Sequence, residues 1–205
     1  MPVPTIIPMS LLEALRNLDT PVEDGLEEVA GEIVSKRLGL SPTVAAQIAR
    51  YQDATRRGDP VSVDEAVGVF RLAGRRPDAP LVFADGGRRV ARYAARLAPF
   101  PVRALIRVGP SAMTRGIGAR TAARLARRIL EVDLMLHEHH AEASAHRTLS
   151  VLALPDGSAC GYYAAAVNEL LRLLTGFEGA MLHEECRAQG GHWCRWRGTQ
   201  VGGYD

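Results

Sequence analysis

The chain has 205 residues, of which 47% are hydrophobic and only 5% aromatic. Its 25 lysines and arginines nearly balance 23 aspartates and glutamates, which gives a formal net charge of +2. This balance argues against a dedicated nucleic-acid-binding protein, which carries a clear positive excess. No apolar run approaches the roughly 18 residues of a membrane span, and no apolar secretory segment opens the chain. We therefore expect a cytoplasmic protein without a membrane span.

Helical spacing of apolar residues runs through the sequence up to residue 129. The expected helices span residues 10–18, 24–38, 41–57, 62–73, 81–97, 102–108 and 111–129. Residues 1–8 form a proline-punctuated tail, and the short first helix behind Ser10 is expected to be peripheral. We assign residues 1–40 to an N-terminal helical arm and residues 41–205 to a single further domain. The pair Gly86-Gly87 either kinks one helix or separates two.

The pattern changes at residue 130. Val132, Leu134 and Leu136 alternate with Asp133, Met135 and His137, which predicts a strand, and residues 147–154 predict a second strand. A turn over residues 155–158 then leads into a helix that ends near Gly176. Residues 178–187 and 192–198 predict a final hairpin. The expected fold class is α+β, with a helical N-terminal half followed by a strand-strand-helix-strand-strand domain.

The three cysteines all fall in the last quarter of the chain, in the pattern C-x25-C-x7-C. Cys160 lies in the first turn of the predicted helix, whereas Cys186 and Cys194 lie on the two strands of the predicted hairpin, with His183 close by. Three thiolates and one imidazole form a tetrahedral zinc site when a fold gathers them. The alternative is that these cysteines are small buried residues or form a disulfide. A reducing compartment favours the metal site over a disulfide.

Residues 130–198 resemble the 4-vinyl reductase domain family, on the pattern of Cys186, Ala188, Gly190 and Cys194 followed by a short apolar strand. The resemblance is strong over about the last third of the chain and loose before it. In the family's aromatic-compound-sensing members, an upstream cysteine, an acidic residue and two late cysteines bind one zinc ion. The resemblance therefore implies a zinc site formed by Cys160, His183, Cys186 and Cys194. His183 stands where those relatives often carry an acidic residue, and imidazole is also a zinc ligand.

The fourth ligand is open to alternatives on strand geometry. Side chains alternate between the two faces of a strand, so His183 and Cys186 point to opposite faces unless the strand bulges, twists sharply or has ended. Glu184 has the same parity as Cys186, and His192 lies near Cys194. Glu184 and His192 are therefore alternatives to His183.

The resemblance also implies a function. By analogy with the sensing members, a pocket between the first hairpin and the helices holds a small hydrophobic or aromatic ligand, with His139, Tyr162 and Tyr163 as contacts. The chain would then be a homodimeric, zinc-stabilised sensor domain that acts through a partner protein. The alternative is a tetrapyrrole-binding accessory protein or enzyme of 4-vinyl reduction. The sequence has no dinucleotide or flavin motif, so an autonomous reductase is not expected.

Overall fold

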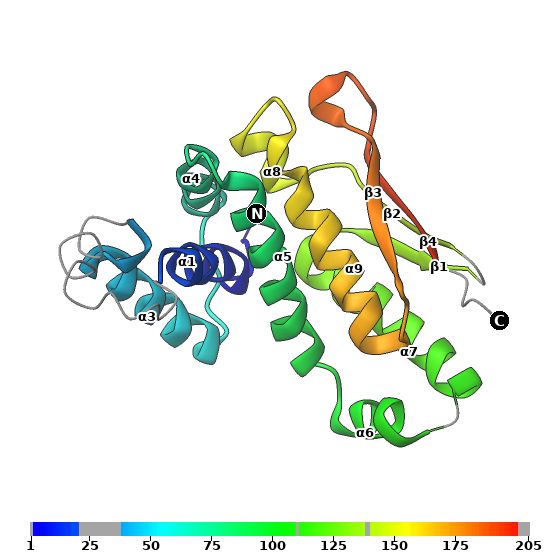
Figure 1. Ribbon diagram of the computed structural model, residues 1–205. Helices are drawn as coiled ribbons and strands as arrows, with labels where there is room; N and C mark the ends of the chain where they lie inside the picture. Colours follow the sequence, from blue (N-terminus) through cyan, green and yellow to red (C-terminus); the bar gives the residue numbers. More distant parts are fainter. Residues whose placement is uncertain (1, 21–37, 110, 138–139, 201–205) are drawn as a thin grey trace, which may run out of the picture.

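The computed structural model describes residues 2–20, 38–109, 111–137 and 140–200 (Figure 1). The predicted helix over residues 24–38 lies outside the described residues except for its last position. The helices are α1 (Ile6–Asp19), α3 (Pro42–Arg57), α4 (Val63–Gly74), α5 (Ala79–Arg96), α6 (Phe100–Val108), α7 (Ser111–Leu125), α8 (Leu149–Ala153) and α9 (Gly161–Thr175). The strands are β1 (Asp133–Leu136), β2 (His140–Ala145), β3 (Gly179–Glu185) and β4 (Cys194–Gln200). The predicted α+β class is confirmed at this level.

Sequence signals at the ends of α3 and α4 act as predicted, whereas Ser10, expected to begin the first helix, lies inside α1 and its hydroxyl donates to the Ile7 carbonyl oxygen. Ser41 begins α3 by accepting a hydrogen bond from the Val44 N–H, and Gly58 ends it in the left-handed conformation at φ 76°. Ser62 begins α4 in the same way, by accepting from the Glu65 N–H. A capping serine satisfies an N–H that has no partner within the helix, and glycine adopts positive φ at little cost. Local chemistry therefore sets these boundaries.

The helices and the sheet form successive layers (Figure 1). α5 and α9 lie side by side in the middle and make the most extensive contact between any two elements. α1, α3 and α4 lie on the far side of α5, whereas the sheet lies on the other side of α9. The hydrophobic core is continuous from α1 through α5 and α9 to the sheet. The N-terminus of α9 and the hairpin of β3 and β4 thus face each other.

The sheet has the strand order β1-β2-β4-β3, and all its neighbouring strands are antiparallel. In β2 the residues at every second position, Ala141, Ala143 and Ala145, are buried. Trp196 of β4 pairs with Ala143 on one side and with His183 on the other. Because directly paired residues share a face, His183 lies on the same face as the fully buried Trp196. That face packs against α9.

Two predictions about elements are wrong. Residues 147–154, predicted as a strand, contain the helix α8, and the second strand is β2, which precedes them. A short apolar run fits either a strand or a buried helix, and here Thr148 decides for a helix because its side chain accepts from the Val151 N–H. The first helix is not peripheral either: α1 begins at Ile6, and Leu11, Ala14 and Leu15 are fully buried. The division at residue 40 stays a prediction.

Glycines let the central helices approach closely. The pair Gly86-Gly87 lies within the single helix α5, and a Cβ on Gly87 would lie 2.2 Å from the Tyr162 carbonyl oxygen of α9. In α7, a Cβ on Gly118 would lie 1.7 Å from the Leu174 carbonyl oxygen. Such distances exclude any side chain, so glycine is required where α5 and α7 meet α9.

Candidate metal centre

Four side chains from three separate segments meet between α9 and the terminal hairpin. One ligand atom each from Cys160, His183, Cys186 and Cys194 lies within 4.8 Å of the other three. The three cysteines are buried, whereas His183 is exposed at one side of the cluster. The structure thus brings together a group of three thiols and one imidazole that could bind a metal ion. This is the set that the sequence resemblance implied.

The turn before α9 positions Cys160. Asp156 Oδ1 accepts hydrogen bonds from both the N–H and the hydroxyl of Ser158, and Gly157 adopts φ 77°. A single 3-10 turn, Ser158–Cys160, follows and leads directly into α9. A Cβ on Gly157 would lie only 2.7 Å from Cys186 Sγ. This glycine therefore gives both the turn and the space that the second thiol occupies.

An irregularity in β3 places His183 and Cys186 on the same side. The pairing with β4 shifts register between His183 and Glu185, and the strand ends at Glu185. Alternation of side chains is therefore interrupted before Cys186, which resolves the parity problem of a regular strand. A 3-10 turn, Arg187–Gln189, and Gly190 at φ 91° then return the chain to Cys194 at the start of β4.

The two alternative ligands lie elsewhere. Glu184 and His192 are exposed and do not belong to the cluster. The His192 backbone N–H donates to Glu185 Oε1 at 3.1 Å, so this part of the hairpin is held by a hydrogen bond of its own. Among the described residues, the geometry therefore favours His183 as the fourth donor.

The donor set fits a tetrahedral ion. For a metal–sulfur distance of about 2.3 Å, two sulfurs of a tetrahedral zinc site lie roughly 3.8 Å apart. Cys160 Sγ and Cys186 Sγ are 3.9 Å apart. A disulfide requires a sulfur–sulfur distance of about 2.05 Å, and all three cysteines are free. The spacing is that of ligands around an ion.

Hydroxyl groups and a tryptophan surround the cluster. Ser150 Oγ lies 3.4 Å from Cys160 Sγ and donates to Thr148 Oγ1, which in turn lies 4.0 Å from Cys194 Sγ. The His183 ring stacks on Trp196, with centroids 5.2 Å apart and planes inclined by 19°. Such outer contacts orient metal ligands. Thr148 and Ser150 were missed by sequence reasoning, because it assigned them to a strand rather than to the start of α8.

Ionisation of Cys194 opposes ionisation of Cys160. The pKa of Cys194 is lowered to about 4, chiefly because the Cys160 thiol donates to its sulfur and, in part, because His183 does so. The pKa of Cys160 is raised well above its usual range by the same interaction and by burial. One thiolate thus forms readily and the next does so reluctantly. Because a metal ion binds only deprotonated thiols, its binding must release protons.

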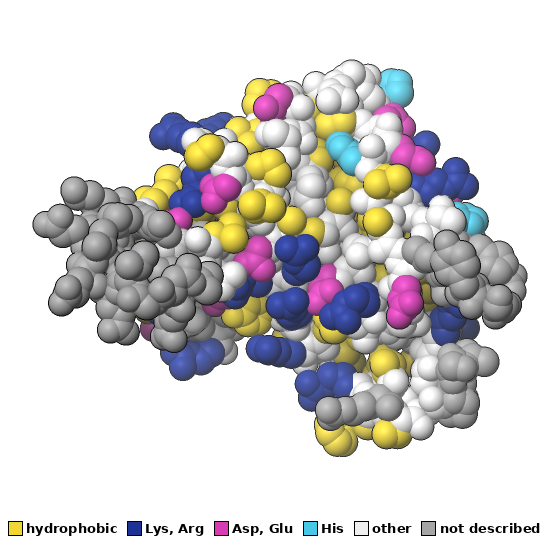
Figure 2. Space-filling model, in the orientation of Figure 1, with side chains coloured by type: hydrophobic (Ala, Val, Ile, Leu, Met, Phe, Trp, Pro, Cys, Tyr) yellow, Lys and Arg dark blue, Asp and Glu magenta, His cyan; other side chains and the backbone are white. Residues whose placement is uncertain are grey.

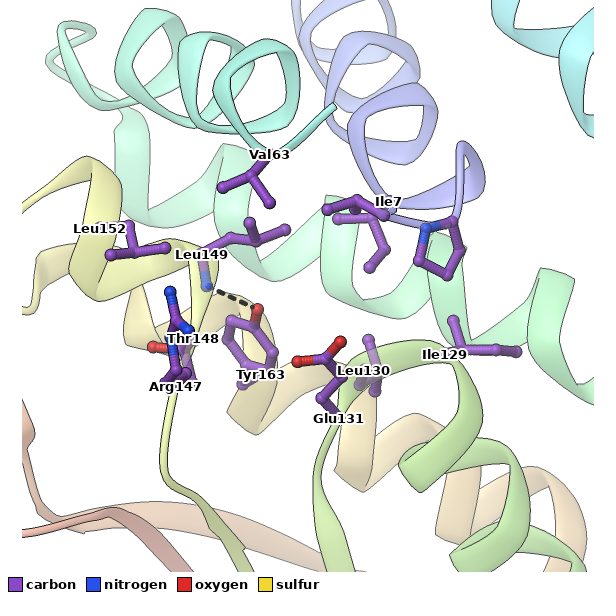
Figure 3. Close-up of a pocket in the computed structure, with 12 residues that line it drawn as sticks. Ile7, Val63, Ile129, Leu130, Glu131, Arg147, Thr148, Leu149, Leu152 and Tyr163 are labelled. Carbon is purple, nitrogen blue, oxygen red and sulfur yellow. Dashed lines mark hydrogen bonds between the residues drawn. The ribbon is translucent and has the colours of Figure 1, made fainter. Parts of the chain in front are cut away.

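A pocket lies beside the cluster, between the N-terminal segment, α4, α8 and the turn that precedes β1 (Figure 3). Its volume is about 90 Å³, and its walls are mainly aliphatic, with Tyr163 and Glu131 among its polar lining residues. The Tyr163 hydroxyl accepts a hydrogen bond from the Leu149 N–H at 3.1 Å (Figure 3). Glu131 has φ 55°, the only positive φ at a non-glycine residue among those described. Its carboxylate faces the Tyr163 hydroxyl across the pocket (Figure 3).

Of the three predicted ligand contacts, the structure places only Tyr163 at this pocket. Tyr162 points to the other side of α9, where its hydroxyl lies 3.0 Å from Ser10 Oγ and its ring packs edge-on against Phe70. It is fully buried in the core and does not line the pocket. His139 lies outside the described residues. Glu131 was missed, since only its backbone conformation marks it.

The Tyr163 ring connects the pocket to the metal cluster. Tyr163 stacks on Trp196 with centroids 5.8 Å apart, and Trp196 stacks on His183. The pocket and the candidate metal site are therefore linked by three rings in a row, those of Tyr163, Trp196 and His183.

Comparisons with known proteins complete the description of the site. None of the described helices is long and apolar enough to cross a membrane. The chain matches no protein-family model and no curated protein sequence. The resemblance to the 4-vinyl reductase family therefore depends on the pattern of Cys186, Ala188, Gly190 and Cys194 followed by a short strand in this chain.

Proposed function

We propose that the chain is a zinc-stabilised domain that binds a small apolar or aromatic molecule and passes on its occupancy to a partner protein. The observation that carries the proposal is the convergence of Cys160, His183, Cys186 and Cys194 within 4.8 Å. These residues come from the start of α9 and from the terminal hairpin. An ion held by all four joins the helix to the sheet.

The role of such an ion is structural. Four protein ligands complete a tetrahedral shell and leave no position for water or substrate, as in zinc sites that stabilise folds. Sulfur and imidazole donors favour zinc over magnesium or calcium, which prefer oxygen ligands. The free energy of metal binding then adds to the free energy of folding. Chemistry at the metal is not part of the proposal.

The pocket beside Tyr163 is the proposed ligand site. An engineered cavity of about 150 Å³ with apolar walls binds one benzene molecule, and the pocket here, about 90 Å³, is of similar order. A single-ring compound is thus the size class that fits. The tetrapyrrole alternative receives no support from this pocket, because even drug-sized ligands occupy about 300–1,000 Å³. Mixing with a porphyrin tests that alternative by the change in Soret absorbance.

The metal proposal is tested by elemental analysis of the purified chain and by zinc titration against a chromophoric chelator. We expect about one zinc ion per chain, as a closed four-ligand site requires. His183→Ala should weaken zinc binding at least tenfold, whereas His192→Ala, a matched histidine on the same hairpin, should leave it unchanged. A metal-free but well-folded chain, or equal effects of the two variants, would contradict the proposal.

The ligand proposal is tested by thermal unfolding of the zinc-loaded chain in a panel of single-ring aromatic compounds. A compound that binds the folded state raises the unfolding temperature, and the rise grows with the logarithm of the ratio of its concentration to its Kd. Val63→Phe, which narrows the pocket, should abolish that rise. The control Leu81→Phe changes an exposed residue of α5 that does not line the pocket and should keep it. Light scattering of the same samples tests the proposed homodimer.

A further inference from the structure

A second, larger hollow lies at the opposite end of the domain, between α5, α6 and α9. It has a volume of about 950 Å³, which is at the upper end of the range for small-molecule sites. Its apolar lining includes Ala95, Phe100, Ala104, Ile106, Leu173 and Leu174. Three arginines, Arg92, Arg96 and Arg103, also line it, and none of its described lining residues is acidic. We call this hollow the α6 groove.

The α6 groove combines exposed apolar surface with positive charge. Phe100 is 73% exposed and Val108 is 83% exposed, both at the ends of α6. Figure 2 shows dark blue basic side chains over the lower parts of α5 and α9 and hydrophobic side chains beside them over α6. Large exposed apolar residues grouped at one place mark interaction sites in soluble proteins.

Two of the three arginines keep their charge available. Arg92 Nε is paired with the buried carboxylate of Glu169 at 3.0 Å. The Arg96 guanidinium lies over the Tyr93 ring, 5.6 Å from its centroid, and makes no ion pair with a described carboxylate. The ion pairs of the described residues include neither Arg96 nor Arg103. Each guanidinium can therefore donate a charge-assisted hydrogen bond to an oxyanion.

We propose that the α6 groove binds an amphipathic carboxylate of the fatty-acid type. Its alkyl chain would lie along the apolar lining, and its carboxylate would reach Arg96 and Arg103. The apolar part of the lining is aliphatic apart from Phe100, and a flexible alkyl chain adapts to such a surface. A long-chain carboxylate supplies both the apolar area and the negative charge that the groove lacks.

Charge distinguishes this ligand from a second copy of the chain. A twofold contact places the same surface on both sides of the interface, so it would bring together two copies of this positively charged groove. Like charges brought together in this way oppose association. An anionic amphiphile instead gains from both features of the groove.

The site is separate from the metal centre and from the Tyr163 pocket, since its lining shares no residue with either. A test of carboxylate binding in the α6 groove is therefore independent of whether the chain binds zinc.

The test is a fluorescence titration of the full-length, zinc-loaded chain with dansyl-labelled undecanoic acid, followed by displacement with dodecanoate. We expect saturable binding, and at least tenfold weaker displacement by dodecanol, which lacks the charge. The double variant Arg96→Gln/Arg103→Gln should bind the probe at least tenfold more weakly. The control Arg56→Gln/Arg57→Gln removes the same charge from exposed positions of α3 and should bind as the wild type does.

Three results would overturn the proposal. They are absence of probe binding, equal affinity of the two double variants, and equal displacement by dodecanol and dodecanoate. Ala104→Trp, which fills the groove, should also abolish binding while circular dichroism shows a folded chain. Light scattering provides the remaining check: a dimer that Phe100→Ser converts to a monomer, together with no probe binding, would identify the groove as a contact between copies and exclude the carboxylate.

Discussion

Replacing Gly157 by alanine tests the metal centre without removing any ligand. Gly157 has φ 77°, and an added Cβ would lie 2.7 Å from Cys186 Sγ. Gly58, at the end of α3, offers a matched control, because its φ is 76° and no atom lies within 4 Å of an added Cβ. Both substitutions impose the same left-handed backbone on alanine. Only Gly157→Ala disturbs a thiol of the cluster.

The magnitudes follow from these two distances. Left-handed backbone at a residue other than glycine costs about 1–2 kcal/mol, so both variants should lose about that much stability without metal. For Gly157→Ala, contact at about 3.5 Å instead of 2.7 Å requires Cys186 Sγ to move by roughly 0.8 Å. Metal–ligand distances tolerate only about 0.2 Å. We therefore expect zinc binding at least tenfold weaker, which is about 1.4 kcal/mol.

The assay combines zinc titration with urea denaturation in the presence and absence of a chelator. In chelator, the thiol of Cys186 can rotate away, so Gly157→Ala and Gly58→Ala should be equally destabilised. With zinc bound, the free energy of unfolding of Gly157→Ala should be lower than that of Gly58→Ala by the free energy of metal binding that the variant has lost. Equal zinc affinity in the wild type and Gly157→Ala would refute the assignment of Cys186 as a ligand.

Three further predictions concern the packing of α9 and the metal. Gly118→Ala should lower the free energy of unfolding by at least about 1–3 kcal/mol, because its Cβ would lie 1.7 Å from the Leu174 carbonyl oxygen. Gly116 lies in the same helix, but open space surrounds the position of an added Cβ. Gly116→Ala should therefore raise the free energy of unfolding by up to about 1 kcal/mol, and urea denaturation distinguishes the two variants. Glu169→Gln should cost about 1–3 kcal/mol at pH 7, because Arg172 lowers the pKa of this buried carboxyl. A carboxyl whose pKa is lowered in the folded state stabilises the fold at pH values above its pKa in the unfolded chain, near 4. This stabilisation is lost as the pH falls through the pKa of the folded state, so the free energies of unfolding of the variant and the wild type should become equal in acid. A difference between them that persists at pH 2 contradicts this prediction. Removal of the metal should change the near-ultraviolet circular dichroism of the buried tryptophan in β4, and an unchanged spectrum would show that its environment does not depend on the ion.

Most helix boundaries and the final hairpin could be predicted because their signals are local. Ser41 and Ser62 cap helices through their own side chains, and Gly58, Gly176 and Gly190 adopt positive φ where the sequence predicts an end or a turn. Each of these signals acts within a few residues of its own position. The α+β order followed from them.

The wrong predictions concern residues whose state depends on distant contacts. The alternation of Ala141, Ala143 and Ala145 in β2 is a weak strand signal because alanine has low strand propensity. The segment nevertheless forms a strand, which pairs with β4 in regular antiparallel register. The sequence of α1 predicts a helix but does not show that the helix is buried, because its burial follows from packing on α5. Periodicity shows which face of such an element is apolar, but not how much of it is covered.

The candidate ligands could be named from the sequence, but their geometry could not. A regular strand would place His183 and Cys186 on opposite faces, and no local signal marks the register shift between His183 and Glu185. The shift depends on pairing with β4, which places Trp196 beside His183. Tyr162 and Tyr163 illustrate the same limit, because adjacent helical residues point in directions about 100° apart and only one of them can face the pocket.

The pocket and the metal cluster meet at the first residues of α8. The Leu149 N–H holds the Tyr163 hydroxyl, whereas Thr148, one residue earlier, lies against Cys194 Sγ and accepts from the Val151 N–H. A change in the position of this turn therefore acts on both sites. Any coupling between two binding equilibria is reciprocal. If a ligand beside Tyr163 tightens the turn and so raises the affinity for zinc by some factor, bound zinc must raise the affinity for that ligand by the same factor. Screens on metal-free protein would then underestimate ligand affinity, which is why the ligand tests use the zinc-loaded chain.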